Sequence, residues 1–422
     1  MGKVWRGNAW CKVNDVTVES GLDVLCTDRL ELLRGRRVGV LCHPASVASD
    51  LTHAVDRLIE AGVRPTRLYG PEHGVRGEAQ DMIGVDDDHD RRTGIPVVSL
   101  YGETFESLAP SAADLAGIDV LVVDLQDVGS RYYTYIWTMV LALEAAFRAG
   151  VAVIVLDRPN PLGGVAIEGG TVGQAYESFV GLGAVPVRHG LTIGEVARLR
   201  LPGMPWGGAR FARPIEGDLT VVPMRGWRRA MNFVEAGLPW VMPSPNMPTP
   251  ATALVYPGQC LFEATNLSEG RGTTRPFEIV GAPFLDGYDW VAALTEMARK
   301  ELPLPGVRFR PLSFRPTFHK FAGRSCGGVQ LHVTDRAAFR PYATGIALIA
   351  SAHRLAPAEF RWRTEPYEFV ADPPAIDLLT GGGDVRRTVD ANAPLGELVA
   401  TFAPFEREFA QHRRPALLPD YP

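Results

Sequence analysis

The sequence has few cysteines, little net charge and no long apolar run. Five cysteines are scattered over 422 residues with no C-x-x-C pair, and such a sparse, odd count is typical of free thiols in a reducing compartment rather than of a disulfide framework. The formal net charge of −5 gives no reason to expect nucleic acid, because nucleic-acid binders usually carry a basic face. No apolar run reaches the roughly 18 residues that a membrane-spanning helix needs, so we expect no membrane insertion.

Export and cofactor signals are absent as well. The stretch MGKVWRGNAWCKVNDVTVESG at residues 1–21 contains no apolar segment of signal-peptide length, which favours a cytoplasmic location. The sequence contains no P-loop, no H-E-x-x-H and no G-x-G-x-x-G motif, so it gives no sign of a bound nucleotide or of a helix-borne metal site. We therefore expect no cofactor.

Short apolar segments alternate with helical patterns through the first 200 residues. The apolar segments with strand character lie at residues 37–42, 66–70, 96–102, 118–127 and 151–159. Helical patterns closed by a glycine lie at residues 49–62 and 133–150. Strands that are apolar throughout and separated by helices indicate a parallel sheet covered by helices on both faces.

A second α/β pattern begins near residue 280. Its segments are GYDWVAALTEMARKEL, GVQLHVTD and YATGIALIASAHRL. A length of 422 residues also argues for two domains. We place the boundary near residue 275, which gives a first domain over residues 1–275 and a smaller C-terminal α/β domain over residues 276–422 that closes a cleft.

Polar, turn-rich sequence follows several of the candidate strands. The stretches CHPAS, GPEHGVRG, DLQDVGSRYYTY and DRPNPLGG each come after an apolar run. The carboxyl ends of parallel strands share one edge of a sheet, and ligands bind outside that edge. We therefore expect these loops to form one cleft with the later stretches VRHG, PSPNMPT and TNLSEGRGT. The residues expected to line it are Glu72, Arg131, Asn160, His189, Asn246 and Glu269.

Several of these polar groups also have a structural explanation. Asp124 and Asp157 end apolar strands and can simply cap helices or pair with arginine. Asn160 lies between two prolines and can set a turn. Glu195 forms a capping box with Thr192 at the start of a helix, and we favour this structural role for it.

Seven longer motifs occur in one order along the chain: GPEHGVRG, DLQDVGSRYYTYIWTM, LDRPNPLGG, VRHGLTIGE, PSPNMPT, YPGQCLFEATNLSEGRGTTRPFE and GAPF. Together they closely resemble the exo-β-N-acetylmuramidase family (NamZ-like), from about residue 35 onward. The resemblance implies a Rossmann-like N-terminal domain, a smaller C-terminal domain and a site between them. It also implies a glycoside hydrolase that removes N-acetylmuramic acid from the non-reducing ends of peptidoglycan fragments. Many members carry an export signal that this sequence does not show, which favours recycled muropeptide inside the cell as the substrate.

The resemblance places the catalytic glutamate in the motif PEHG, which makes Glu72 the candidate acid. Glycoside cleavage needs an acid that protonates the leaving oxygen and a second carboxylate that acts as nucleophile or base. A glutamate on a short, glycine-flanked loop can reach a sugar without obstruction by its own backbone, and His73 can orient it. For the second carboxylate we favour Glu269, which also lies in a glycine-rich loop, over Glu278 and Asp127.

The substrate suggests which residues bind it. Muramic acid carries a lactyl carboxylate, which a guanidinium can hold with two hydrogen bonds. Arg76, Arg131 and Arg271 are the candidates for this contact. The other candidate substrate-binding residues are Tyr132, Asn160, His189 and Asn246.

Two other functions fit the same residues. A metal-dependent hydrolase would use Glu72, His73 and Asp81 with the acidic run DDDHD at residues 86–90, although such a run is more typical of a solvated loop. A non-catalytic protein that binds muropeptides would also use a cleft between two α/β domains. Sensitivity to chelators separates the first from a metal-free glycosidase, and turnover of a chromogenic muramide decides the second.

Overall fold

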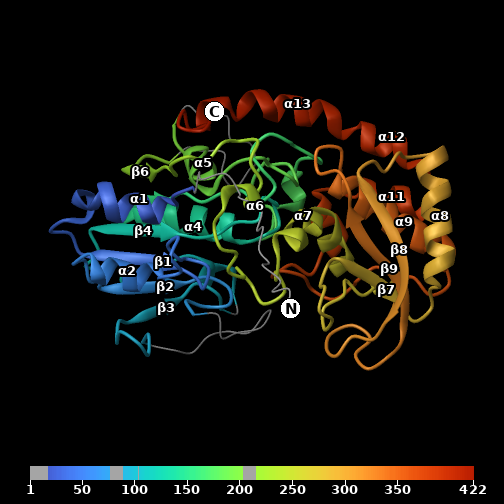
Figure 1. Cartoon of the computed structure of the whole chain (residues 1–422), viewed down its shortest axis with the longest axis horizontal. Coiled ribbons are helices and arrows are strands. Elements are labelled where there is room, and N and C mark those ends of the chain that lie inside the picture. Colours follow the sequence, from blue (N-terminus) through green and yellow to red (C-terminus); the bar gives the residue numbers. More distant parts are fainter. Residues whose placement is uncertain (1–17, 77–88, 103, 203–214) are drawn as a thin grey trace, which may run out of the picture.

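Figure 1 shows the computed structural model of the chain, which describes residues 18–76, 89–102, 104–202 and 215–422. Two lobes lie side by side, one built around strands β1–β6 and the other around strands β7–β9. None of the helices in the described part of the chain combines the length and the apolar character that a membrane crossing requires.

The first lobe contains a six-stranded parallel sheet in the order β3-β2-β1-β4-β5-β6. Its strands are β1 (Val38–Cys42), β2 (Arg67–Gly70), β3 (Val97–Ser99), β4 (Val120–Asp124), β5 (Ala152–Leu156) and β6 (Leu219–Val222). Strands β2 and β3 extend the sheet on one side of β1, and strands β4 to β6 extend it on the other side. This strand order is that of the doubly wound nucleotide-binding folds. The predicted Rossmann-like α/β fold is confirmed.

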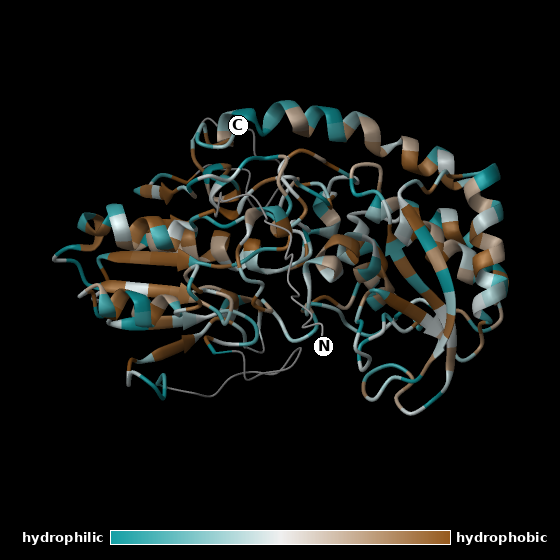
Figure 2. Ribbon diagram, viewed as in Figure 1, coloured by the Kyte–Doolittle hydropathy of each residue, from teal (hydrophilic) through white to brown (hydrophobic). Residues whose placement is uncertain are grey.

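Helices cover both faces of this sheet. Val120 and Val122 of β4 pack in one core with α1 (Gly21–Asp28) and α2 (Ala54–Glu60). The alternate residues Leu121 and Val123 pack in the other core with α4 (Tyr135–Arg148) and α5 (Ile193–Arg198). Because both faces are buried, the central strands β1, β4 and β5 are apolar along almost their whole length, as the hydropathy colouring of Figure 2 shows.

Local sequence determines where these helices begin. Thr192 caps α5 and forms the predicted capping box with Glu195. The start of α2 differs from expectation, because His53 caps it at Ala54 whereas the helical pattern began at residue 49. Ser49 instead donates to Asp23 of α1, so the first residues of that pattern form a loop. The shorter helices of this lobe are η1 (Leu30–Leu33), η2 (Phe105–Leu108), α3 (Ala112–Leu115), η3 (Gln174–Tyr176) and α6 (Phe233–Ala236).

The second lobe contains a three-stranded antiparallel sheet in the order β7-β9-β8. Its strands are β7 (Ile279–Ala282), β8 (Val307–Phe314) and β9 (Cys326–Val333), and its longer helices are α8 (Gly287–Lys300) and α9 (Pro341–Leu355). The shorter helices are α10 (Ala375–Thr380), α11 (Asp384–Asp390) and α12 (Leu395–Ala400). The predicted smaller C-terminal α/β unit is confirmed.

Packing favours a boundary between the lobes that lies earlier than the predicted residue 275. Helix α7 (Pro250–Gln259) packs against α9, and η4 (Cys260–Ala264) packs against α10. Both elements therefore belong with the second lobe, and we propose a boundary near residue 250.

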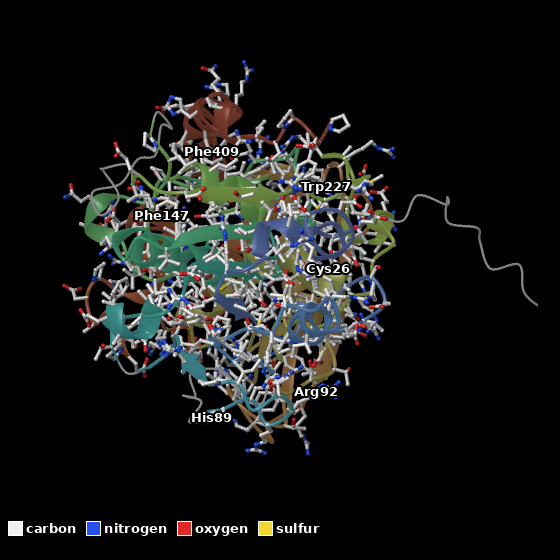
Figure 3. All side chains as sticks on the ribbon, turned by 90° about the vertical axis from the view of Figure 1, so that its left-hand side faces the viewer. Cys26, His89, Arg92, Phe147, Trp227 and Phe409 are labelled. Atoms are coloured by element: carbon white, nitrogen blue, oxygen red, sulfur yellow. The ribbon has the colours of Figure 1, made fainter. Side chains whose placement is uncertain are left out.

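The C-terminal segment returns to the first lobe. Helix α13 (Phe402–His412) runs over both lobes and is followed by η5 (Arg414–Ala416). Figure 3 places Phe409 of α13 beyond the β6 side of the sheet, with His89 and Arg92 at the opposite end. The hydroxyl of Tyr421 then donates to Oδ2 of Asp157 over 2.6 Å.

Two glycines allow α7 and α9 to pack in direct backbone contact. A Cβ added to Gly345 of α9 would lie 2.6 Å from Cα of Gly258 in α7. We expect Gly345→Ala to lower the free energy of unfolding by about 1–3 kcal/mol, although alanine favours a helix by roughly 1 kcal/mol over glycine. Urea unfolding followed by tryptophan fluorescence measures the change.

Gly382→Ala is the control for this substitution, because nothing lies within 4 Å of the Cβ it would add. Equal or greater stability of the Gly345→Ala variant would contradict the close packing of α7 on α9.

Candidate active site between the lobes

A cavity of about 550 Å³, measured with the solvent at its mouth, lies where the two lobes meet. The first lobe contributes the loop after β2, the segment before α4 and the loop before α7. The second lobe contributes α7, η4 and two loops. The lining residues are Glu72, His73, Tyr132, Tyr133, Thr134, Tyr135, Val180, Ser244, Asn246, Met247, Tyr256, Glu263, Arg271, Phe277, Tyr367 and Glu368.

Glu72 is held in place by the loop that carries it and by α4. Its side chain is 8% exposed, and the hydroxyl of Thr134 donates to its Oε2 over 3.2 Å. The next residue, His73, has a φ of +71°, a left-handed conformation that is uncommon for any residue other than glycine. The chain therefore turns sharply after Glu72. A Cβ on Gly70 would lie 3.1 Å from the nitrogen of Val75, so the close packing of the loop explains this glycine.

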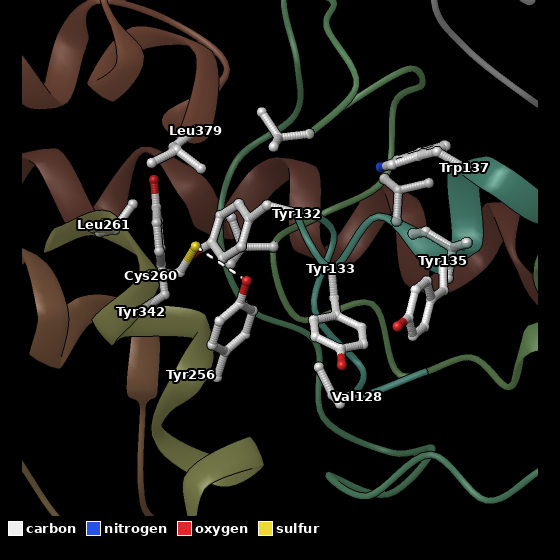
Figure 4. Close-up of a cluster of buried hydrophobic side chains, with 14 of the residues drawn as sticks. Val128, Tyr132, Tyr133, Tyr135, Trp137, Tyr256, Cys260, Leu261, Tyr342 and Leu379 are labelled. Carbon is white, nitrogen blue, oxygen red and sulfur yellow. Dashed lines mark hydrogen bonds between the residues drawn. The ribbon is translucent and has the colours of Figure 1, made fainter. Parts of the chain in front are cut away.

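Tyrosines form much of the cavity wall. Figure 4 shows Tyr132, Tyr133 and Tyr135 along one segment of the first lobe and Tyr256 on α7. The ring of Tyr133 meets that of Tyr135 at 5.0 Å and that of Tyr256 at 5.6 Å, both edge to face, the arrangement that aromatic quadrupoles favour. The hydroxyl of Tyr135 donates to the carbonyl of Pro243 over 2.6 Å.

These phenols are neutral. Burial raises the pKa of Tyr133, Tyr135 and Tyr256 well above the usual value for tyrosine. The wall therefore offers a ligand apolar ring faces without adding negative charge.

A salt-bridge cluster on the second lobe forms another part of the cavity wall. Nη2 of Arg271 lies 2.9 Å from Oε1 of Glu263, and its Nη1 lies 3.4 Å from Oε1 of Glu269. The guanidinium also lies 5.3 Å from the ring centre of Phe277, within range of a cation–π contact. The hydroxyl of Tyr367 donates to Oε2 of Glu263 over 2.7 Å. Two glutamates of this cluster share one arginine, but only Glu263 lines the cavity.

Comparison with known protein families matches both lobes. The model of the N-terminal part of the exo-β-N-acetylmuramidase NamZ matches residues 38–251, and that of the C-terminal part matches residues 254–418. The chain belongs to the NamZ family. The resemblance that the sequence motifs indicated is thereby confirmed.

Individual known proteins are similar to this chain over almost its whole length. The peptidoglycan β-N-acetylmuramidase NamZ of Bacillus subtilis is 43% identical over 402 residues, which cover 95% of this chain and 91% of the relative. Two crystal structures of DUF1343 family proteins from Bacteroides fragilis have TM-scores of 0.83 and 0.71 at 32% and 26% identity. They cover 97% and 95% of this chain, and 100% and 98% of the respective solved chains.

Five of the ten residues that we predicted for the site from the sequence line this cavity. They are Glu72, His73, Tyr132, Asn246 and Arg271. The other five, Arg76, Arg131, Asn160, His189 and Glu269, are not among the lining residues. The expectation that loops at the strand ends all line one cleft therefore holds only in part.

Glu269 is buried behind the cavity wall. It is 0% exposed and contacts Nζ of Lys320 at 3.0 Å and Nδ1 of His319 at 3.1 Å, in addition to Arg271. Burial alone would raise the pKa of Glu269, but the positive charge of Lys320 and the contacts with His319 and Arg271 hold it well below the usual value. This geometry suits a fixed counter-ion and argues against the predicted role as second carboxylate.

Two of the three candidate arginines bind the protein itself. Arg76 makes a bidentate contact with Asp90, at 3.0 and 3.1 Å. Arg131 is 0% exposed, and its guanidinium donates to the backbone carbonyls of Gly170, Val185 and Leu379 over 2.6–2.9 Å. Arg271 is the candidate whose guanidinium lines the cavity.

Asn160 and His189 organise loops. The side chain of Asn160 donates to the carbonyl of Leu191 and accepts from the nitrogen of Leu162, both over 2.9 Å, so it sets a turn as its structural alternative proposed. His189 accepts from the nitrogen of Leu191 over 3.1 Å and places Nε2 3.2 Å from Asp127.

The acidic residues at the ends of β4 and β5 are structural. Asp124 makes a bidentate contact with Arg158, at 2.5 and 2.8 Å. Asp157 accepts from the nitrogen of Gly194 at the start of α5 over 2.8 Å, and burial raises its pKa to about 7. These contacts are the capping and pairing that the structural interpretation proposed.

The sequence did not single out several residues that line the cavity, above all Glu263, Tyr256 and Tyr367. Tyr256 and Glu263 lie in the helices α7 and η4 rather than in a polar loop. Tyr367 comes from a segment of the second lobe that follows no strand of the parallel sheet. The rule that ligands bind at strand ends could not point to either region.

The described residues include no group of three or more His, Cys, Asp or Glu side chains that could hold a metal ion. Asp81 and residues 86–88 of the acidic run lie outside those residues. The metal-dependent alternative therefore gains no support from the residues around Glu72 and His73.

Arg131 gives a test of structural against substrate-binding roles. We expect Arg131→Lys to lower the free energy of unfolding by at least about 2 kcal/mol, because lysine cannot reach three carbonyls at once and hydrogen bonds to charged groups contribute roughly 1.5–3 kcal/mol each. Thermal and urea unfolding measure the loss.

The matched control for this test is Arg336→Lys, since Arg336 is exposed. An Arg131→Lys variant as stable as the wild type would show that the guanidinium is not required to hold these loops.

Proposed function

We propose that this chain is a glycoside hydrolase that releases N-acetylmuramic acid from the non-reducing ends of peptidoglycan fragments, with Glu72 as the catalytic acid. The observation that carries the proposal is the similarity to the β-N-acetylmuramidase of Bacillus subtilis over 95% of the chain. The cavity between the lobes supports it, because Glu72 lines that cavity.

The surroundings of Glu72 suit an acid that meets a sugar. Its loop turns sharply at His73, so the carboxyl group projects from the backbone into the cavity. The hydrogen bond from Thr134 holds Oε2 of this carboxyl group in the cavity. Tyrosine rings beside it provide apolar faces for a pyranose ring and exclude water from the reacting bond.

Arg271 is our candidate for recognition of the lactyl carboxylate. Among the described residues that line the cavity, it is the only arginine or lysine. It is held by Glu263, Glu269 and the ring of Phe277, which fixes the direction of its planar guanidinium. A fixed cation at the wall of a small cavity favours a sugar that carries a carboxylate over one that lacks it.

The place of the reaction in the cell stays a prediction. The four cysteines in the described part of the chain are free, which agrees with the reducing cytoplasm expected from the sequence. Cytoplasmic substrate would be muropeptide that the cell recycles. Fractionation of cells that express the chain with its native ends tests this location.

Replacement of the proposed acid tests the reaction. Glu72→Gln keeps the size of the side chain and the hydrogen bond with Thr134 but removes the ionisable proton. We expect turnover of a chromogenic N-acetylmuramide to fall by roughly 10²–10⁴-fold, with the melting temperature unchanged.

Glu60→Gln, on the exposed end of α2, is the control and should keep full activity. Near-normal turnover of the Glu72→Gln variant would place the acid elsewhere. Loss of activity with a chelator would favour the metal-dependent alternative, and a wild type without turnover would favour the non-catalytic binding protein.

Substrate discrimination tests the role of Arg271. We expect the wild type to cleave an N-acetylmuramide far faster than the matching N-acetylglucosaminide, because the second sugar leaves the guanidinium without its carboxylate. Arg271→Lys should lower the ratio of the two kcat/KM values by about tenfold or more, since lysine cannot form the bidentate contact.

Arg76→Lys is the control, because Arg76 contacts Asp90 away from the cavity, and it should leave the ratio unchanged. If Arg271→Lys lowers both kcat/KM values equally, Arg271 does not recognise the lactyl carboxylate.

A further inference from the structure

The cavity contains a glutamate that is well placed for chemistry and that was not among the candidates from the sequence. Glu263 lies in η4, on the second lobe, and is 9% exposed. It lines the same cavity as Glu72, which comes from the first lobe. A sugar bound between the lobes therefore meets one carboxylate from each.

Two neighbours fix the carboxylate of Glu263. Arg271 donates to Oε1 over 2.9 Å, and the hydroxyl of Tyr367 donates to Oε2 over 2.7 Å. Burial raises the pKa of Tyr367 well above its usual value, so this phenol remains a donor. A carboxylate held by a guanidinium and a phenol keeps one orientation, and each oxygen retains a lone pair that the two donors do not use.

Glu269 shows what a purely supporting role looks like in the same cluster. It contacts the same arginine, but it is 0% exposed and its oxygens face Lys320 and His319. Glu269 can hold Arg271 but does not line the cavity. Glu263 does both.

We propose that Glu263 is the second carboxylate of the hydrolysis, a role that rests on the proposed function. Glu72 gives its proton to the glycosidic oxygen, which keeps the electron pair of the breaking bond to the anomeric carbon. Glu263 supplies an electron pair to that carbon, either through its own oxygen or through a water whose proton it takes. One water is consumed in both routes, and its oxygen ends on the anomeric carbon.

The choice of Glu263 over Glu368, the other glutamate of the second lobe in the cavity, follows from the elements that carry them. Glu263 lies in a helical segment that packs against α10. Glu368 lies in the loop 367–370 at a φ of +47°, next to Phe369, which is 38% exposed. Groups on rigid elements are held more precisely than groups on loops.

Chemical rescue tests the proposal. The full chain is assayed on a chromogenic N-acetylmuramide with a good leaving group, with and without sodium azide. We expect Glu263→Ala to lower kcat by at least about 10²-fold. Azide fills the space left by the carboxylate, so it should restore turnover and yield a glycosyl azide. The anomeric configuration of the sugar that the wild type releases, read by NMR, tells the nucleophile route (retention) from the base route (inversion).

Glu269→Ala is the matched control, because it removes the other carboxylate that contacts Arg271. Its activity should not respond to azide. Glu263→Gln, which keeps the contact with Tyr367, should lose turnover with an unchanged melting temperature and without rescue, since it leaves no space for azide.

Three results would overturn the assignment. The first is a folded Glu263→Ala variant whose loss azide does not repair, which would reduce Glu263 to a support for Arg271. The second is azide rescue of Glu368→Ala or Glu269→Ala in its place. The third is a Glu263→Gln variant with normal kcat. Each leaves the proposed function standing as long as the wild type turns over, whereas an inactive wild type would overturn both.

Discussion

The buried guanidinium of Arg131 joins the two lobes on which the cavity depends. It donates to carbonyls of Gly170 and Val185 in the first lobe and of Leu379 at the end of α10 in the second. Burial lowers the pKa of Arg131, so ordered carbonyl dipoles must offset the cost of removing this cation from water. The tyrosine wall begins at the next residue, Tyr132. The contact that joins the lobes therefore also positions one wall of the site.

The cavity groups of the second lobe depend on contacts within that lobe. Gly258 and Gly345 let α7 lie directly on α9, which determines where Tyr256 enters the cavity. Arg271 is fixed from behind by Glu269 and faces the cavity beside Glu263. Packing within each lobe thus orients the cavity side chains of that lobe. Because the cavity lies between the lobes, one ligand can contact both sets of side chains. This arrangement keeps the polar groups oriented before a ligand arrives, which lowers the cost of binding.

Sequence reasoning succeeded where one local cause dominates. Apolar runs buried on both faces indicated the parallel sheet, and the pair Thr192 and Glu195 indicated a helix start. It did not indicate where a polar side chain binds backbone groups of the same chain, as Arg131 does, because loop sequence does not reveal what a polar group contacts. In one case a glycine was misinterpreted as a sign of a ligand-binding loop. Gly270, beside Glu269, has a φ of +78° and a position that a Cβ would bring against the backbone of Ile279, so it serves the turn and not a ligand. Glu263 was missed because its partner Tyr367 lies 104 residues away.

The return of the C-terminal segment to the first lobe affects how the protein folds during synthesis. The hydroxyl of Tyr421 binds Asp157, the nitrogen of Leu418 binds Glu195, and the carbonyl of Pro422 accepts from Arg229. A nascent chain that has emerged as far as residue 250 has all six strands of the parallel sheet but none of these three partners. The first lobe is therefore completed only after residues 417–422 have left the ribosome, and the second lobe must be made before the first is finished. Vectorial synthesis thus couples the completion of the two lobes, even though each has its own sheet.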